Sequence, residues 1–175
     1  MVMKAEHVVP LRVPIESVDL ENWIFTLSDE DYQAASKAHR AAGTTMYDGV
    51  RGTVNVEDIG GTLIVQHYRE VSADRRHFEL FSPRSRGYFF HLIPIRMEVR
   101  WTMSAEPRGA TGSSLRCVVE INLAPVLRLL SKTSATGWFV RRHVREEAAG
   151  FARDIERKHA EGRTPPSLLI DRRSG

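Results

Sequence analysis

The sequence is poor in cysteine: its 175 residues contain one, Cys117. A single thiol cannot close an intramolecular disulfide, and it leaves no cysteine-based zinc site. Cys117 stands in an alternating stretch, where it shares a predicted strand face with Leu115, Val119 and Ile121. We therefore expect it to be a small core residue rather than a nucleophile.

The sequence also lacks long apolar runs. No stretch approaches the roughly 18 uninterrupted apolar residues that a membrane-spanning helix requires. The first residues lack the apolar core of a secretion signal. We therefore expect a cytoplasmic protein without a membrane partner.

Several catalytic and binding motifs are missing. The sequence has no serine-hydrolase elbow, phosphate loop, dinucleotide fingerprint or His-Glu-x-x-His zinc-protease motif. The net charge is +3 and the pI about 9.3, but the arginines are spread along the whole chain and form no recognisable nucleic-acid-binding module. We set these enzyme classes aside and expect no nucleic-acid partner.

What the sequence does contain is a long amphipathic helix over residues 138–155. Steps of four residues place these side chains on one helix face: Phe139, His143, Glu147, Phe151 and Ile155. A histidine and a glutamate therefore stand inside an apolar stripe that we expect to be buried. Burying an ionisable pair is costly unless a partner satisfies it, and a metal ion or a bound substrate would do so.

A simpler interpretation of His143 and Glu147 is a structural pair. On a helix surface such a pair contributes a few tenths of a kcal/mol, about 0.2–0.5, and in a core the two side chains can satisfy each other. The opposite face of the helix already carries the charged residues, among them Arg141, Arg142 and Arg145. Because the pair lies on the apolar face instead, we give the functional and the structural interpretation equal weight.

The order of the predicted elements indicates an α+β fold in one domain over residues 1–160, with a loosely ordered tail over residues 161–175. A first strand over residues 7–15 precedes a helix from Ser28 to Gly43. The remaining elements are strands near 50–57, 62–69, 76–82, 88–104 and 114–123, a hairpin loop at 105–113, and a short helix near 125–130. A curved antiparallel sheet wrapped around the last helix is the economical packing of these parts.

This element order resembles the helix-grip fold of the START-like (SRPBCC) superfamily, which includes polyketide cyclases and birch-pollen-allergen-like carriers. The resemblance covers most of residues 5–160, and it rests on the element order and on the final helix. It implies an apolar or aromatic small-molecule ligand between sheet and helix. Monomer and homodimer both stay open.

The strands supply candidate partners for the helical His/Glu pair. His67 shares a face with Leu63 and Val65, the side that we expect to point inward, and Glu98 lies on the strand that follows Pro94. Together with the helical pair they provide two imidazoles and two carboxylates. This donor set suits Zn²⁺, and also Mn²⁺ or Fe²⁺.

With these four residues the sequence also resembles a narrower family, the zinc-dependent 2,4-diacetylphloroglucinol hydrolases, which are helix-grip enzymes that cleave a carbon–carbon bond. That family has a histidine and then a glutamate on two strands, followed by His-x-x-x-Glu on the last helix. Here His67, Glu98, His143 and Glu147 match that pattern. The resemblance implies that they are the metal ligands. The chain is short for the family, and the family's phenol-binding tyrosines have no counterpart that we can place.

Strand alternation argues against Glu98 as a ligand. Residues of the opposite parity are apolar: Met97, Val99 and Trp101. If they point inward, Glu98 points to solvent unless a bulge at Pro94 turns the strand, and His91 is then the substitute. His77 and Glu79 are more typical of a solvated strand edge. The remaining histidines are expected at the surface: His7, His39 and His159.

A metal ion at this site would polarise a ketone oxygen and lower the pKa of bound water toward about 7. We predict His143 and Glu147 as catalytic residues, with Glu147 also able to move a proton. The expected walls of the substrate pocket are aromatic: Phe90, Trp101, Phe139 and Phe151. The sequence thus predicts a metal-dependent hydrolase, with zinc the first choice of metal, that acts on an acyl-phenol-like ketone and cleaves a carbon–carbon bond.

Two other functions fit the same element order. A metal-free carrier for an apolar metabolite would use the helical pair as polar anchors, and a polyketide-cyclase-like enzyme would use the pocket to shape its substrate. A purely structural protein is less consistent with the sequence, because a packed core would more simply carry leucine at positions 143 and 147.

Overall fold

The computed structural model describes residues 3–109, 111–123 and 136–162. Its elements, in chain order, are the strand β1 (Met3–Leu11), the short 3-10 helix η1 (Ile15–Ser17), the helices α1 (Leu20–Thr26) and α2 (Asp29–Ala35), the strands β2 (His39–Tyr47), β3 (Val50–Ile59), β4 (Thr62–Asp74), β5 (His77–Phe89), β6 (Ile93–Arg108) and β7 (Gly112–Leu123), and the helix α4 (Thr136–Ala160). No helix in these ranges is long and apolar enough to cross a membrane.

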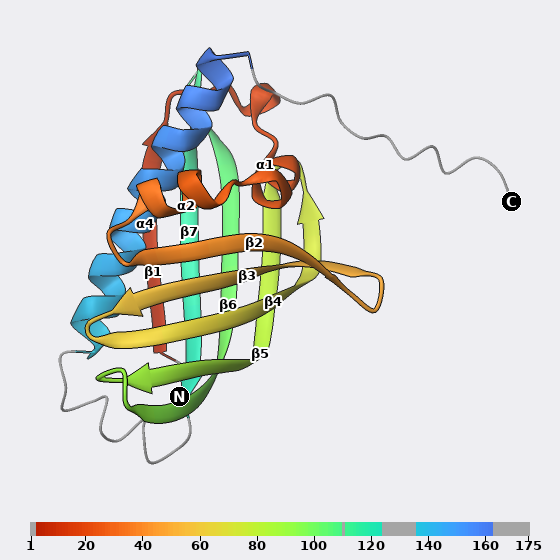
Figure 1. The fold of residues 1–175 in the computed structure, drawn as a ribbon. Helices are drawn as coiled ribbons and strands as arrows, with labels where there is room; N and C mark the ends of the chain where they lie inside the picture. Colours follow the sequence, from red (N-terminus) through yellow and green to blue (C-terminus); the bar gives the residue numbers. More distant parts are fainter. Residues whose placement is uncertain (1–2, 110, 124–135, 163–175) are drawn as a thin grey trace, which may run out of the picture.

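The strands form one seven-stranded antiparallel sheet in the order β1-β7-β6-β5-β4-β3-β2. The sheet curves strongly, so that β2, β3 and the first part of β4 run roughly horizontally in Figure 1, whereas β1, β7 and β6 run roughly vertically. Register shifts in β5, between Ser82 and Ser85, mark bulges that increase the bend. The two buried serines satisfy each other, with Ser85 Oγ donating to Ser82 Oγ at 2.8 Å.

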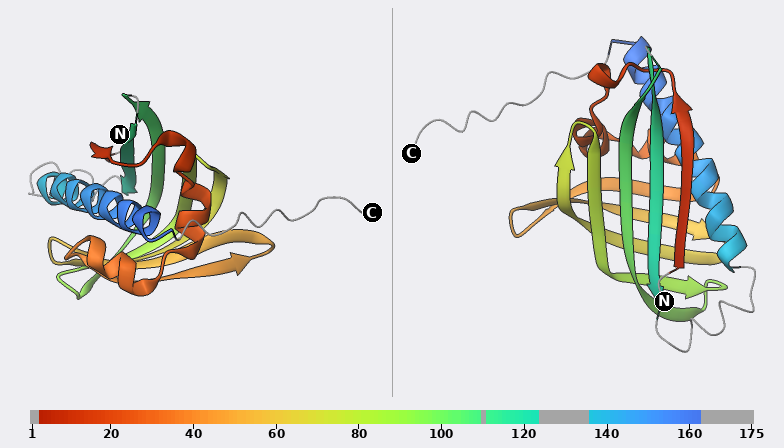
Figure 2. Two further views of the ribbon diagram at one scale, coloured as in Figure 1. Left: turned by 90° about the horizontal axis from the view of Figure 1, so that it is seen from above. Right: turned by 180° about the vertical axis from the view of Figure 1, so that it is seen from behind.

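Helix α4 lies along the concave side of this sheet, as Figure 2 shows from above and behind. Its buried side chains meet an apolar inner face on β6 and β7. The main residues of this core are Met97, Val99, Trp101, Met103, Leu115, Cys117, Val144, Ala148 and Phe151. The predicted α+β helix-grip architecture is therefore confirmed, and Cys117 is buried.

The N-terminal part differs from the prediction. The first strand is Met3–Leu11 rather than residues 7–15, and the unpredicted α1 follows it, with Asp19 capping its first turn. The helix that begins after Ser28 ends at Ala35 and not at Gly43, because the backbone of Ser36 is extended. The end of α2 packs directly on α4 at Gly150, where a Cβ atom would lie 2.1 Å from the Ala35 carbonyl oxygen.

The strand predicted over residues 88–104 is two strands. A turn separates β5 from β6, and Phe90 and His91 adopt positive φ angles of 49° and 61° in it. The predicted loop at 105–113 is shorter, because β6 continues to Arg108. The helix predicted near 125–130 and residues 163–175 of the predicted tail lie outside the described residues.

Candidate metal centre

Four buried side chains come together between the sheet and the last helix. They are His39 at the start of β2, Glu57 near the end of β3, and His143 and Glu147 on α4, and one ligand atom from each lies within 4.8 Å of the others. The Nε2 atom of His39 is 3.7 Å from Oε1 of Glu147. The Nε2 atom of His143 is 3.7 Å from Oε2 of Glu57 and 4.0 Å from Oε2 of Glu147.

The backbone explains why these residues meet. His39 pairs with Glu57 across the β2–β3 ladder, and residues four apart share one helix face. In Figure 1 the start of β2 and the end of β3 lie beside α4. The contact between Ala35 and Gly150 fixes the end of α2, from which the chain passes directly into His39.

The two histidines are oriented by bonds outside the cluster. Nδ1 of His39 lies 2.6 Å from the carbonyl oxygen of Tyr32. A carbonyl only accepts, so Nδ1 carries a hydrogen and Nε2 faces the carboxylates. The Tyr32 ring stacks on His39 at 3.8 Å, and Nδ1 of His143 lies 3.4 Å from the hydroxyl of Ser36. Outer bonds of this kind fix the tautomer of histidines that bind metals.

The carboxylates are also held in place. Tyr32 donates its hydroxyl to Oε1 of Glu57 at 2.6 Å, and Nε2 of Gln66 donates to Oε2 of the same residue at 3.2 Å. The thiol of Cys117 lies 3.8 Å from Oε2 of Glu147. The cluster therefore has an outer layer of donors that orients both acids.

The electrostatics of the cluster favour a cation. Burial is the largest influence on His39 and acts to lower its pKa, but Glu147 and Glu57 outweigh it and the pKa is raised. Burial, with the same two carboxylates, raises the pKa of Tyr32 well above 10.0, so its phenol stays protonated. Among the described residues, Nε2 of His39 is a buried polar atom without a hydrogen-bond partner. A positive ion at the centre would satisfy it and balance the two carboxylates.

The donor set fits a transition-metal ion. Zinc bonds of about 2.0–2.2 Å in tetrahedral geometry place the ligand atoms roughly 3.4 Å apart. Three of the separations are 3.7–4.0 Å, and all four ligand atoms lie within 4.8 Å of one another. Rotamer changes that draw the four side chains inward would bring them to bonding distance of one ion.

A small cavity of about 20 Å³ adjoins the cluster. Its polar walls are Glu57, Gln66, Trp101, His143 and Glu147, and the remaining lining is largely apolar. A space of this size holds about one water molecule. Oε1 of Gln66 and Nε1 of Trp101 have no hydrogen-bond partner in the described structure, so the cavity wall offers an unused acceptor and an unused donor.

The structure brings together two of the four predicted ligands, His143 and Glu147. His67 is exposed, because its neighbours of opposite parity, including Gln66 and Tyr68, are the ones that point inward on β4. Glu98 is exposed as well and accepts a hydrogen bond from Asn122 at 2.9 Å. The strand residues that the structure places beside the helical pair are His39 and Glu57 instead.

Sequence reasoning missed His39 because it was assigned to a helix and then to the surface. The Asp48-Gly49 turn was an available signal, because this dipeptide favours hairpins and so predicts strands on both sides of it. Glu57 was missed because residues 50–57 were predicted only as an alternating strand, with no buried face assigned to it. The buried side of β3 is polar and consists of Thr53, Asn55 and Glu57.

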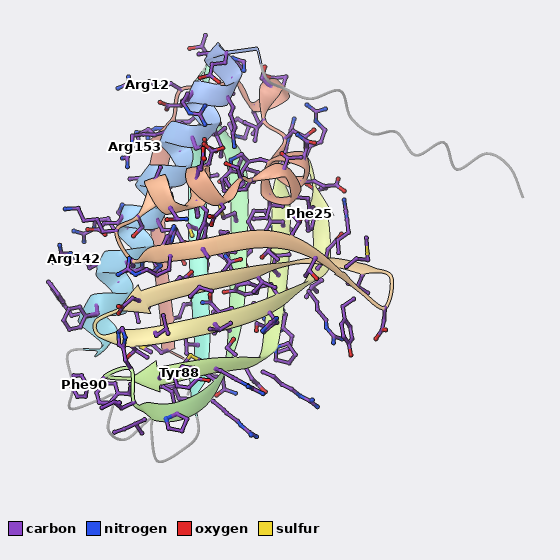
Figure 3. The ribbon with its side chains drawn as sticks, viewed as in Figure 1. Arg12, Phe25, Tyr88, Phe90, Arg142 and Arg153 are labelled. Carbon is purple, nitrogen blue, oxygen red and sulfur yellow. The ribbon has the colours of Figure 1, made fainter. Side chains whose placement is uncertain are left out.

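The predicted pocket aromatics do not form one wall. Trp101 and Phe151 are buried in the core with ring centroids 5.6 Å apart. Phe90 and Phe139 are 65% and 38% exposed, and Figure 3 shows Phe90 at the outer end of the domain. His91, the substitute ligand, is exposed and contacts Asp58, while Glu79 bonds to Arg100 at the sheet surface.

Comparison with known proteins identifies structural relatives only. No family model matches the chain, and neither does any curated protein sequence. The narrower resemblance to the diacetylphloroglucinol hydrolases therefore stays a prediction.

Several solved structures share this fold and cover most of the chain. TTHA0849 from Thermus thermophilus has a TM-score of 0.58 and 18% identity, covering 91% of this chain and 98% of that one. The ZhuI aromatase/cyclase from Streptomyces sp. R1128 has a TM-score of 0.59 and 13% identity, covering 91% and 96%. A START superfamily protein from Mycobacterium smegmatis has a TM-score of 0.53 and 12% identity, covering 87% and 98%. The chain therefore has the helix-grip fold of START-like proteins.

Proposed function

We propose that this protein is a metal-dependent hydrolase in which His39, Glu57, His143 and Glu147 hold one divalent ion, with zinc the first choice. The observation that carries the proposal is the buried cluster itself. Both imidazoles are anchored through Nδ1 and turn Nε2 toward two carboxylates. Such an arrangement is costly to bury without a cation. Manganese or iron would suit the same donors.

When bound, the ion would polarise a carbonyl and acidify a water molecule. The chain's own residues then position that water and move its protons. The cavity beside the cluster has room for one water, and Oε1 of Gln66 is free to accept from it. Glu147 borders the same cavity and is the candidate to take up the proton.

The substrate class we propose is an acyl-phenol-like ketone. In its hydrolysis, water adds its oxygen to the acyl carbon, the bond between that carbon and the ring breaks, and the ring carbon takes up a proton. The products are a carboxylic acid and the deacylated phenol. Typical ligand pockets measure about 300–1,000 Å³, so the cavity of about 20 Å³ must widen to admit such a substrate. Its apolar lining, which includes Val99, Ile121 and Val140, would face the ring.

The first test is metal content, measured by elemental mass spectrometry on protein purified without a nickel column. We expect close to one zinc, manganese or iron per chain in the parent and none in His39→Ala or Glu57→Ala. The matched controls are His67→Ala and Glu98→Ala, which change exposed residues of the same types and should keep the metal. Metal loss in the controls but not in the first pair would contradict the proposed ligand set.

Hydrolysis is tested separately. The zinc-loaded parent should release a carboxylic acid from acyl-phenols, whereas His39→Ala should not. A parent that binds zinc but cleaves none of them would leave the metal site standing and remove the proposed reaction.

A second candidate function is a metal-free carrier or cyclase for an apolar molecule. The apolar side of the cavity and the likeness in fold to an aromatase/cyclase support it. It predicts that the parent contains no metal and that added zinc does not raise its melting temperature. Native mass spectrometry would then reveal a co-purifying apolar molecule.

A further inference from the structure

Exposed apolar side chains gather at one end of the domain. Among residues 3–109, 111–123 and 136–162, eleven large apolar side chains are exposed. Six of them lie in two short segments, the β5–β6 turn and the first turn of α4: Phe89, Phe90, Leu92, Ile93, Trp138 and Phe139. We call these six residues the apolar tip. Leu92 is 81% exposed and Phe90 65%. A concentration of this kind marks an interaction surface more often than scattered exposed residues do.

The two segments of the apolar tip form one surface because both contact the same turn. A Cβ atom on Gly60 would lie 2.8 Å from the Phe139 ring, and one on Gly61 would lie 3.7 Å from the Phe90 ring. The left-handed backbone of Phe90 and His91 holds the β5–β6 turn in a conformation that non-glycine residues seldom adopt. The fold thus keeps a sparsely populated backbone conformation in the turn that carries most of these side chains.

Arginines without acidic partners border the tip. Arg86 and Arg96 are exposed and lie directly opposite each other on β5 and β6, a like-charge pairing that destabilises a sheet. Neither has a carboxylate partner in the described parts of the chain, and the same holds for Arg141 on the second turn of α4. Arg142, which pairs with Glu146 at 3.6 Å, lies over the Trp138 ring at 5.4 Å. Unpaired positive charge beside exposed apolar groups fits an anionic partner with an apolar interior.

We propose that the apolar tip docks onto the surface of an anionic lipid bilayer, with Leu92 and Ile93 entering the acyl region and Arg86 and Arg96 contacting the headgroups. A second copy of the chain fits less well, because a two-fold contact through this end would bring the same arginines together. The sequence pointed away from a membrane partner only by lacking a spanning segment, which is no test of surface contact.

The test is co-sedimentation of the full chain with vesicles of phosphatidylcholine alone and with vesicles that also contain phosphatidylglycerol. We expect binding to the anionic vesicles only. Arg86→Glu/Arg96→Glu should weaken it by at least about 25-fold, taking roughly fivefold for each arginine lost. Leu92→Ser/Ile93→Ser should weaken it by at least about tenfold.

Matched controls distinguish an effect of the apolar tip from a general effect of losing positive charge or apolar surface. Arg12→Glu/Arg153→Glu changes two exposed arginines at the opposite end of the domain, as Figure 3 shows, and Met46→Ser/Val71→Ser changes two exposed apolar residues elsewhere. Both should retain binding. Circular dichroism and melting temperature check that all four variants fold.

Three outcomes would overturn the proposal. The first is no binding to either vesicle, and the second is equal binding to both. The third is a dimer, seen by analytical ultracentrifugation, that Leu92→Ser/Ile93→Ser dissolves, because it would assign the tip to a contact between copies. None of these readouts depends on the metal site.

Discussion

The two halves of the sheet present opposite chemistry to the same helix. The inner face of β6 and β7 is apolar, with Val99, Trp101 and Leu115 against α4. The inner face of β2, β3 and β4 carries buried polar groups: Asn55, Glu57 and Gln66 are almost fully buried, beside the core residues Ile64 and Tyr68. Since buried polar atoms cost free energy unless paired, the comparison suggests that the apolar half stabilises the fold and the polar half is kept for chemistry.

The largest effect should come from the apolar half. Trp101 is 2% exposed. Trp101→Ala removes its indole ring and leaves a cavity in the core that the surrounding sheet cannot fill. We expect the free energy of unfolding in urea to fall by about 3–5 kcal/mol. Trp138→Ala is the matched control: its indole is 52% exposed, and the change should stay within about 0.5 kcal/mol. Equal losses would contradict the division between the halves.

The polar half should respond in the opposite direction. In metal-free protein, His143→Leu/Glu147→Leu replaces a buried ionisable pair with apolar side chains, and we expect the free energy of unfolding to rise by about 1–4 kcal/mol. The control is Arg142→Leu/Glu146→Leu, a pair at the same spacing on the exposed face of α4, where we expect a change within about 0.5 kcal/mol. A loss in the first variant would show that the pair serves the fold.

A smaller effect should come from Gln66, which holds the proposed ligand Glu57 by a hydrogen bond. Gln66→Met keeps the length of the side chain but removes its hydrogen bond to Glu57. We expect zinc affinity, measured by competition with a chelator, to fall about 10–100-fold, with little change in stability. Gln33→Met, at an exposed glutamine that bonds to Asp29, should leave the affinity unchanged.

The same contrast explains what the sequence could and could not predict. Periodicity on α4 and element order were sufficient for the fold and for the burial of His143 and Glu147, because both follow from an apolar stripe. The rule that apolar residues point inward then failed on β3 and β4. Val54, Val56 and Val65 lie on the outer side, while Asn55, Glu57 and Gln66 are buried.

His39 shows a second limit of prediction from the sequence. Its position depends on where α2 ends, and that end is set by the close contact between Ala35 and Gly150, which are more than a hundred positions apart in the sequence. No local pattern encodes such a contact. The site is assembled from one helix and two strands, and it can be predicted only if the position of each can be. Here the start of β2 depends on a long-range contact, so the whole site could not be predicted.

The smallest effect should come from the ion pairs that hold α2 against α4, outside both halves of the sheet. Asp31 accepts from Arg157 at 2.7 Å and lies 3.0 Å from Nζ of Lys158. Burial, the largest influence on this carboxyl, acts to raise its pKa, but Lys158 and Ser28 outweigh it and the pKa lies below 3.8.

A pKa that is lower in the folded state gives stability above the unfolded value and loses it as the pH falls through the folded value. Asp31→Asn should therefore cost up to about 1 kcal/mol at neutral pH, and urea unfolding should show the difference narrowing below about pH 4. If the variant also binds zinc more weakly at neutral pH, the ion pairs of Asp31 position His39 as well as stabilising the fold. Unchanged zinc binding would mean that the β2–β3 ladder alone is sufficient to place that ligand.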